Sequence, residues 1–129
     1  MALHNYYPKE KILLMSKVFA TLEMFGDGKI ASVSVLKAML EECGAKQEHT
    51  EGFVDIIRGI PGVEVALLLR EVSADSTKVS LRSNGQVNVA EVCGAFGGGG
   101  HKMAAGAVLT CSLKEARERM MQHLLGQLS

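Results

Sequence analysis

Four consecutive glycines precede His101 in the stretch GAFGGGGHKMAAGA, residues 94–107. Glycines lose much backbone entropy on folding and add no side chain to a core, so such a run suits a loose linker or a close approach of the backbone to a ligand. Consecutive glycine N–H groups can converge on one anion. The segment HKMAAG can form a helical turn whose N-terminus adds positive partial charge. The pattern therefore predicts a phosphate site at Gly98, Gly99, Gly100 and His101.

The surroundings of the glycines favour a built site over a linker. The run lies between a stretch that predicts a helix and one that predicts a strand, without the Ser or Pro of a flexible linker. Arg82 lies on the polar face of the alternating stretch TKVSLRSN, residues 77–84, and could supply a bidentate cation to the same phosphate. An arginine on the polar face of a strand is as often simply solvated, so both interpretations of Arg82 stay open.

Other sites that use glycine, metal or a nucleophile do not fit the spacing. A Walker loop requires Gly-Lys-Ser/Thr, whereas His101 follows the glycines here, and a G-x-G-x-x-G fingerprint would need glycine in place of Lys102 or Met103. Cys93, His101 and Cys111 lack the paired C-x2-C spacing of a metal site. No serine lies in a G-x-S-x-G context. We therefore expect this chain to bind no metal and to carry no catalytic residue.

Length and composition limit the class of protein. The chain has 129 residues, of which 47% are hydrophobic and two are proline, and this predicts one folded domain, 1–129. Fourteen basic residues balance fourteen acidic ones, which disfavours coating of duplex nucleic acid but allows a pocket for one or two phosphates. The three cysteines stand in hydrophobic contexts and indicate buried thiols. The first ten residues, MALHNYYPKE, contain no hydrophobic signal core, so we expect a cytoplasmic protein with no membrane contact.

The elements that must position the glycine run follow from hydrophobic periodicity and capping signals. We expect a first helix from Pro8 through Phe25, a strand at KIASV, a second helix capped by Ser34 and a third capped by Thr50. Strands at 63–73, 77–84 and 106–111, a helix at 89–96, and a final helix at 112–128 with Ser112 and Glu115 as a capping box complete the chain. The fold class is therefore α/β, with a mixed β-sheet of about four or five strands flanked by α-helices.

The stretch SLRSNGQVNVAEVCGAFGGGGHKMAAGA resembles the C-terminal substrate-binding domain of the DHH phosphoesterase superfamily, the first type of DHH-associated domain. In that family an SLRS strand precedes a helix and a GGGGHxxAAG loop. The segments TEGFVDIIRGIPGVEVALLLRE and FGDGKIA are also similar, most of all to the bifunctional oligoribonucleases that remove phosphate from 3′-phosphoadenosine 5′-phosphate. The resemblance covers nearly the whole chain.

The resemblance implies a function for these residues. The glycine loop and His101 would hold the phosphate or sugar of a short oligoribonucleotide or nucleoside phosphate, and Arg82 would help to clamp it. Two manganese ions in a separate DHH catalytic lobe would activate water. The Asp-His-His signature of that lobe has no counterpart here, because His4, His49, His101 and His123 are never adjacent. We therefore expect the catalytic lobe to be absent from this chain, and the chain to be inactive alone.

Two alternatives remain from the sequence. The domain could serve a relative that acts on pyrophosphate, cyclic dinucleotides or single-stranded DNA. It could also be a non-catalytic interaction module that forms a homodimer or pairs with another chain. The first helix, with Leu13 and Leu14 beside its main apolar stripe, would provide such a contact.

Overall fold

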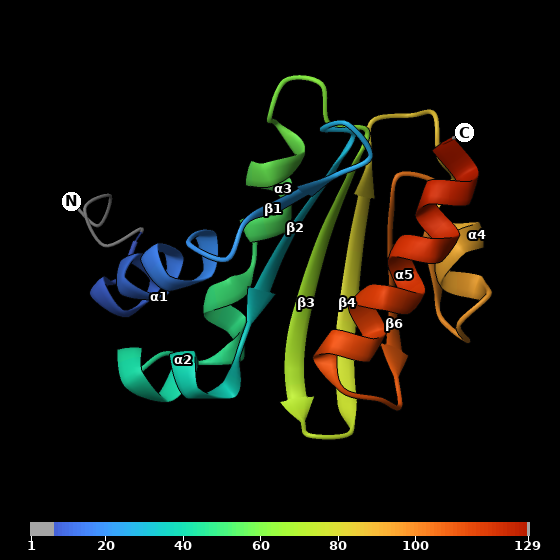
Figure 1. Cartoon of the computed structure of the whole chain (residues 1–129). Coiled ribbons are helices and arrows are strands. Elements are labelled where there is room, and N and C mark those ends of the chain that lie inside the picture. Colours follow the sequence, from blue (N-terminus) through green and yellow to red (C-terminus); the bar gives the residue numbers. More distant parts are fainter. Residues whose placement is uncertain (1–6, 129) are drawn as a thin grey trace.

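A six-stranded mixed sheet organises residues 7–128, which are the residues that the computed structural model describes (Figure 1). The strand order is β1-β2-β3-β4-β6-β5; β2 and β3 pair in parallel and the other neighbours pair antiparallel. The strands are β1 (Glu23–Phe25), β2 (Ile30–Val35), β3 (Val65–Ser73), β4 (Ser76–Ser83), β5 (Gly99–His101) and β6 (Ala104–Leu109). The helices are α1 (Lys9–Phe19), α2 (Lys37–Cys43), α3 (Phe53–Arg58), α4 (Val89–Gly94) and α5 (Leu113–Leu128), with a short 3-10 helix, η2 (Gln47–Thr50), before α3.

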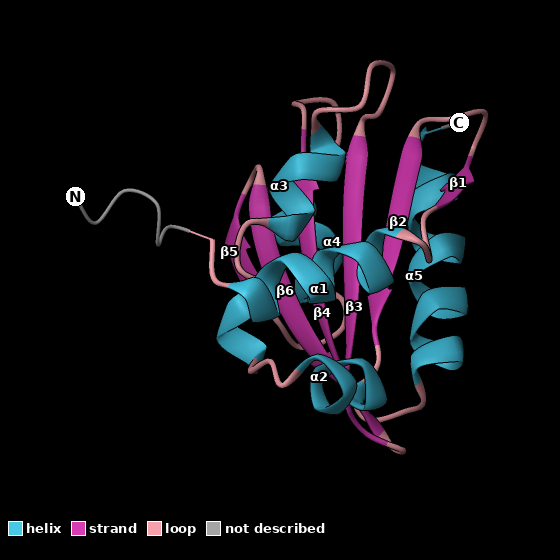
Figure 2. Ribbon diagram, turned by 90° about the vertical axis from the view of Figure 1, so that its left-hand side faces the viewer, coloured by secondary structure: helices cyan, strands magenta, loops and turns pink. Residues whose placement is uncertain are grey.

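The sheet has a hydrophobic core on each face. Helices α1, α2 and α3 pack over β2 and β3 on one face, and α4 and α5 cover the other (Figure 2). Strand β3 is buried on both faces over Val65–Leu69, which is why that stretch is a continuous apolar run. Strand β4 alternates: Thr77, Val79, Leu81 and Ser83 are buried on the α5 side, and Lys78, Ser80 and Arg82 lie on the opposite face. The polar face of β4 therefore lies on the same side of the sheet as α1, α2 and α3. These helices pack mainly over β2 and β3, so the polar face of β4 stays partly exposed.

The α/β class and the mixed sheet are confirmed, with six strands in place of the expected four or five. Two strands are additional to the four that the sequence placed: β5, which contains Gly99–His101, and β1, which forms where the sequence predicted the end of the first helix. Helix α1 instead ends at Phe19, and Glu23 pairs with Ser32 of β2. Strand β1 forms as a local hairpin with β2 across the turn at 26–29, and the helical spacing of Leu22 and Phe25 does not reveal it.

Two predicted helix caps are wrong. Ser34 is buried inside β2, where its backbone N–H donates to Thr21 Oγ1 at 2.8 Å, and α2 begins only at Lys37. Thr50 belongs to η2. Ser34 has the local signature of a cap because it is a small polar residue before an apolar run, but here a distant partner satisfies it inside a strand. The Thr50 hydroxyl instead donates to the Gln47 carbonyl within η2, at 2.6 Å.

The last helix forms where it was predicted, with the Ser112 half of the expected capping box. The Ser112 hydroxyl accepts a hydrogen bond from the Glu115 backbone N–H at 3.2 Å. Glu115 also pairs with Arg119 at 3.4 Å, one turn later. The apolar stripe of α5 packs into the core beneath β3 and β4. The three cysteines are buried and free, as expected.

Candidate functional site

Arg82 and His101 lie in one row across the sheet. Arg82 of β4 is opposite Ala104 of β6, and Ala104 is in turn opposite His101 of β5. Residues directly opposite each other in a sheet project to the same face, and neighbouring strands are about 4.8 Å apart. The sequence-predicted cation and histidine therefore share one face, two strands apart, with only the small side chain of Ala104 between them.

The segment after the glycines is a hairpin, and the predicted helical turn at HKMAAG is wrong. Strands β5 and β6 are joined by Lys102 and Met103. The carbonyl of Lys102 accepts from the Val89 backbone N–H, and that of Met103 from the Ser83 N–H, both at 2.9 Å. These bonds tie the hairpin to the start of α4 and the end of β4. His101 is thus an exposed residue of an edge strand, and no helix N-terminus adds its partial charge there.

The four glycines differ in what they do. Gly97 has φ +84° and follows α4, and the Gly98 backbone N–H donates to the Cys93 carbonyl at 2.8 Å as that helix ends. A Cβ at Gly98 would lie 2.2 Å from the Gly106 carbonyl oxygen, so the close packing of the hairpin requires glycine there. The Gly98 amide is therefore engaged within the chain, and its predicted role as a donor to phosphate has no support from this geometry.

At Gly99 and Gly100 a backbone N–H group is available as a hydrogen-bond donor to a ligand. A Cβ at Gly100 would lie 2.6 Å from the Ala104 carbonyl oxygen, whereas one at Gly99 would meet nothing within 4 Å. Amides alternate along an antiparallel edge strand, so one of these two residues directs its N–H away from β6. Gly99 is paired with Gly106 and belongs to the same face as His101, where the backbone is open to a ligand.

An aspartate on α3 holds Arg82. Arg82 Nε lies 3.2 Å from Asp55 Oδ1, and Arg82 Nη1 donates to the Leu81 carbonyl at 3.0 Å. Arg58 also contacts Asp55 Oδ1, at 3.3 Å. Among residues 7–128, Arg82 Nη2 has no hydrogen-bond partner, and the side chain is 27% exposed. The guanidinium is thus oriented by the protein and keeps one donor for a ligand.

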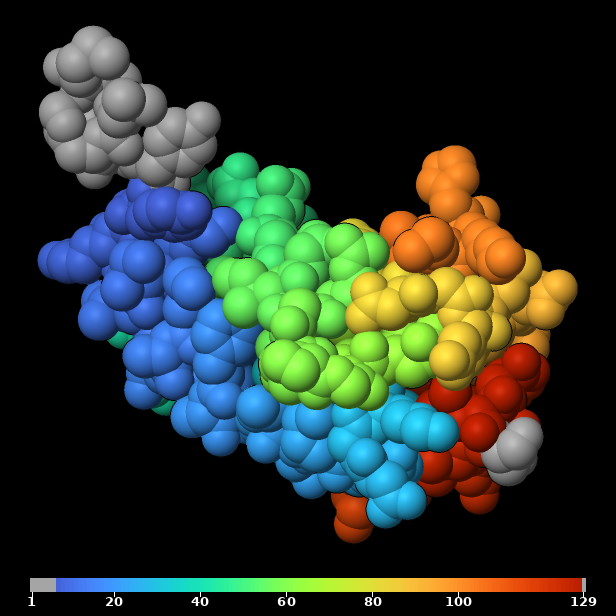
Figure 3. All heavy atoms as spheres, turned by 90° about the horizontal axis from the view of Figure 1, so that it is seen from above, coloured from blue at the N-terminus to red at the C-terminus, as the bar shows by residue number. Residues whose placement is uncertain are grey.

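The surface beside Arg82 is hollowed. A hollow of about 350 Å³ lies between β4 and the start of α3, lined by Thr50, Glu51, Gly52, Val54, Leu68, Ser80 and Arg82. In Figure 3 the orange hairpin stands out on one side of the yellow end of β4, and the green α3 region lies on the other. A ligand on this face would therefore rest between the hairpin and α3.

Sequence reasoning missed two residues that shape this region. Asp55 is one, and the buried Glu64 is the other. The Glu64 carboxylate accepts hydrogen bonds from the backbone N–H groups of Gln86, at 2.5 Å, and Val87, at 3.4 Å, and so fixes the loop between β4 and α4. Nothing local marks either carboxylate, because each meets its partners only across the fold.

The buried thiols and the potential metal ligands among the described residues differ from what a reactive cysteine or a metal site requires. Burial raises the pKa of the Cys93 thiol to about 11 and also raises that of Cys111, so both thiols are protonated near neutral pH. No group of three His, Cys, Asp or Glu side chains within residues 7–128 is arranged to hold a metal ion; His4 lies outside this range. No helix in the same range is long and apolar enough to cross a membrane.

Comparison with known proteins assigns this chain to a protein family. The DHHA1 domain model matches residues 19–128. This chain belongs to the DHHA1 domain family. The resemblance indicated by the SLRS strand and the GGGGH loop is thereby confirmed, and Arg82 and His101 both lie within the matched residues.

Proteins similar to this DHHA1 domain are much longer than it. The bifunctional oligoribonuclease and PAP phosphatase NrnA of Thermus thermophilus is 32% identical over 126 residues, 97% of this chain and 37% of that protein. An exopolyphosphatase-related protein from Bacteroides fragilis superposes with a TM-score of 0.85 at 28% identity, covering 97% of this chain and 36% of that one. The pGpG-specific phosphodiesterase PggH from Vibrio cholerae shares the fold, with a TM-score of 0.62 at 14% identity, covering 94% of this chain and 39% of its own. This chain spans little more than a third of the length of each.

Proposed function

We propose that this DHHA1 domain binds the phosphate of short oligoribonucleotides or of a nucleoside bisphosphate for a manganese-dependent DHH phosphoesterase. The observation that carries the proposal is the placement of Arg82 and His101 on one open face, in one row across β4, β6 and β5. A phosphate above Ala104 would have a guanidinium on one side and an imidazole on the other. The name of the similar Thermus thermophilus protein, an oligoribonuclease and PAP phosphatase, supports this choice of substrate.

Each residue would have a separate task in binding. Arg82 would donate from Nη2 to a phosphate oxygen, because Asp55 and the Leu81 carbonyl already hold Nε and Nη1. His101 would donate a hydrogen bond to phosphate or to a sugar hydroxyl. The outward amide at Gly99 or Gly100 would add a third donor. The small residues Ala104 and Gly106 would let the sugar-phosphate chain lie against the sheet.

Hydrolysis would take place in a DHH catalytic lobe that faces this domain. The potential metal ligands among residues 7–128 do not cluster, so manganese does not fit here and would belong to that lobe. The domain would supply substrate binding and orientation alone. We accordingly expect no phosphoesterase activity from this chain by itself.

An NMR titration with a 5′-phosphorylated diribonucleotide tests the proposal. We expect shifts at Gly99, Gly100, His101 and Arg82, with a Kd on the order of a millimolar because only half of the site is present. Arg82→Ala and His101→Ala should both weaken binding. Arg119→Ala, on the opposite face, is the matched control and should leave it unchanged. If no shift appears at millimolar ligand, the binding proposal is wrong for the isolated domain, and the glycines serve packing alone.

A second function has some support from the surface of α1. Leu14 packs in the domain's own core, but Ile12 and Leu13 are 49% and 45% exposed, and Ile56 of α3 is also exposed. These side chains could contact a catalytic lobe or a second copy of the chain. Light scattering across a concentration series would detect a homodimer, and Leu13→Glu should dissociate it if α1 forms the contact.

A further inference from the structure

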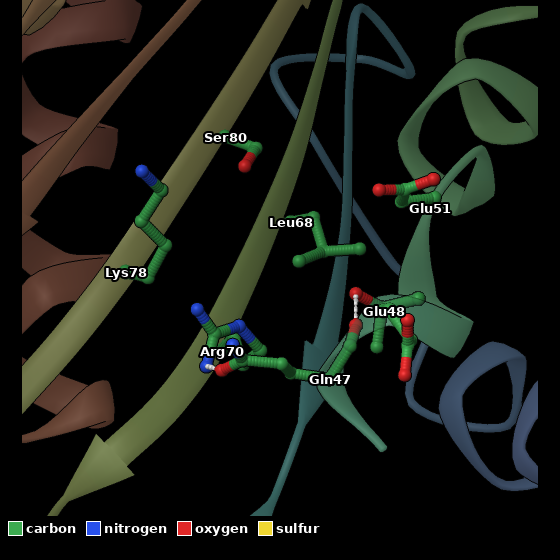
Figure 4. A pocket seen from close by; sticks show the side chains of 8 residues that line it. Gln47, Glu48, Glu51, Leu68, Arg70, Lys78 and Ser80 are labelled. Atoms are coloured by element: carbon green, nitrogen blue, oxygen red, sulfur yellow. Dashed lines mark hydrogen bonds between the residues drawn. The ribbon is translucent and has the colours of Figure 1, made fainter. Parts of the chain in front are cut away.

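Two more cations lie on the same face as Arg82 and directly oppose each other. Arg70 of β3 is paired in register with Lys78 of β4, while Arg82 is four residues further along β4. Like charges placed opposite each other in a sheet repel and are destabilising. The strand register therefore places two cationic residues side by side on this face, with the Lys78 side chain extended towards Ser80 (Figure 4).

The protein does not neutralise this pair. Arg70 Nη1 donates to the Gln47 side-chain oxygen at 3.0 Å, which is a neutral partner. Within residues 7–128, the Lys78 side chain has no hydrogen bond or ion pair. Arg82, by contrast, is paired with Asp55. Arg70 and Lys78 are therefore the less compensated cations on this face.

The pair borders a hollow of its own. A space of about 340 Å³ is lined by Gln47, Glu48, Thr50, Glu51, Leu68, Arg70, Lys78 and Ser80. Figure 4 shows Arg70 and Lys78 on the strand side, with Glu48 and Glu51 on the helix side and Leu68 between. Neither glutamate forms an ion pair with these cations. The two carboxylates would repel an anion from the helix side and so confine it to the strand side.

This hollow continues into the one beside Arg82. The two share Thr50, Glu51, Leu68 and Ser80. Four residues along a strand place the Cα atoms of Lys78 and Arg82 about 13 Å apart, and Asp55 holds the Arg82 guanidinium towards α3. A ligand with phosphates spread along a chain could use both ends of this continuous surface.

We propose that Arg70 and Lys78 bind a second, internal phosphate of the same single-stranded oligonucleotide whose end phosphate lies at Arg82 and His101. This inference rests on the proposed function and adds to it a preference for ligand length. A mononucleotide fills only the Arg82 end. A trinucleotide or tetranucleotide reaches the pair, with Ser80 along its path.

The test compares ligand lengths on the whole 129-residue chain. NMR titrations would use a 5′-phosphorylated ribo-mononucleotide and the corresponding tetranucleotide at low salt. In the unchanged protein we expect the tetranucleotide to bind about tenfold more tightly, with added shifts at Ser80 and Lys78. The double variant Arg70→Gln, Lys78→Gln should remove that gain and leave mononucleotide binding unchanged. Its salt dependence for the tetranucleotide should fall by about 0.7 in log–log slope for one lost phosphate contact.

A control variant that loses the same number of positive charges elsewhere distinguishes a direct contact at Arg70 and Lys78 from general electrostatic attraction of the oligonucleotide. Lys114→Gln with Arg119→Gln removes two positive charges from α5, on the other face, and should keep the length preference. Lys78→Gln alone provides a milder variant that tests the same contact. Equal affinity for both lengths in the unchanged protein, or an unaltered preference in the double variant, would overturn this inference and leave the proposed function standing. Absence of binding to either ligand would reject both.

Discussion

Asp55 holds Arg82 through a contact of 3.2 Å between Oδ1 and Nε, although the two residues are 27 positions apart in the chain. The carboxylate therefore has two opposing effects on a phosphate at Arg82. It orients the guanidinium, and it places a negative charge near the ligand. Substitutions at Asp55 can separate these effects.

Asp55→Asn should strengthen phosphate binding. The amide oxygen can still accept from Arg82 Nε, while the repulsion between two anions is removed; at a separation of several ångströms in water this corresponds to about threefold in affinity. The loss of stability should stay within about 1 kcal/mol, since the pair is partly exposed. Titration with the diribonucleotide measures the first effect and urea unfolding the second. Weaker binding by Asp55→Asn would show that orientation by the charged form dominates.

The glycines before His101 should respond differently to alanine. Gly98→Ala places a Cβ against the Gly106 carbonyl and should cost about 2 kcal/mol or more of unfolding free energy. Gly99→Ala meets open space and should cost within about 0.5 kcal/mol. Urea unfolding of both variants tests this contrast. A comparable cost at the two positions would mean that the hairpin relaxes freely around a new methyl group.

The Gly99→Ala variant also tests whether the phosphate of the ligand contacts the backbone at Gly99. If the phosphate approaches the backbone at Gly99, the methyl group should weaken diribonucleotide binding several-fold without unfolding the protein. Undiminished binding would restrict the contact to Arg82 and His101.

Glu64→Ala should loosen the loop that follows β4. Removing the carboxylate leaves the buried N–H of Val87 and the N–H of Gln86 without their acceptor, at a cost of about 2 to 3 kcal/mol. Amide hydrogen exchange should speed up at both positions, and urea unfolding should give the stability change. Glu41→Ala, an exposed residue of α2, is the matched control. Unchanged exchange at Gln86 would show that the loop is held by its backbone contacts alone.

Stability should fall in alkali partly because of Cys93. Burial raises the pKa of its thiol from about 9 to about 11. The folded state therefore keeps a proton that the unfolded state loses, so this contribution is complete below about pH 9 and disappears as the pH rises through about 11. Cys93→Ala should lower stability at pH 8 and flatten the decline between pH 9 and 11. Urea unfolding at pH 8 and pH 10.5 would measure both, and an equally steep decline in the variant would contradict the assignment.

Several elements follow from local sequence alone. The run at 63–73 and the alternation at 77–84 predict β3 and β4, because a doubly buried strand is continuously apolar and a half-buried one alternates. The cap at Ser112 marks α5 for the same kind of local reason. The glycine–histidine motif likewise identifies the family from a short stretch.

The arrangement of the site was decided by the tertiary structure. The sequence predicted Arg82 and His101 separately, but only strand pairing through Ala104 puts them in one row. The sequence predicted a helical turn at HKMAAG. In the structure this segment instead forms the β5–β6 hairpin, whose strand β6 pairs with the edge of β4, so the expected helix dipole is absent there. Asp55 and the Arg70–Lys78 pair have no local signature, because contacts between distant strands and helices depend on register and packing. Local patterns thus determined which residue types and elements are present, and the pairing of the sheet determined which of them meet.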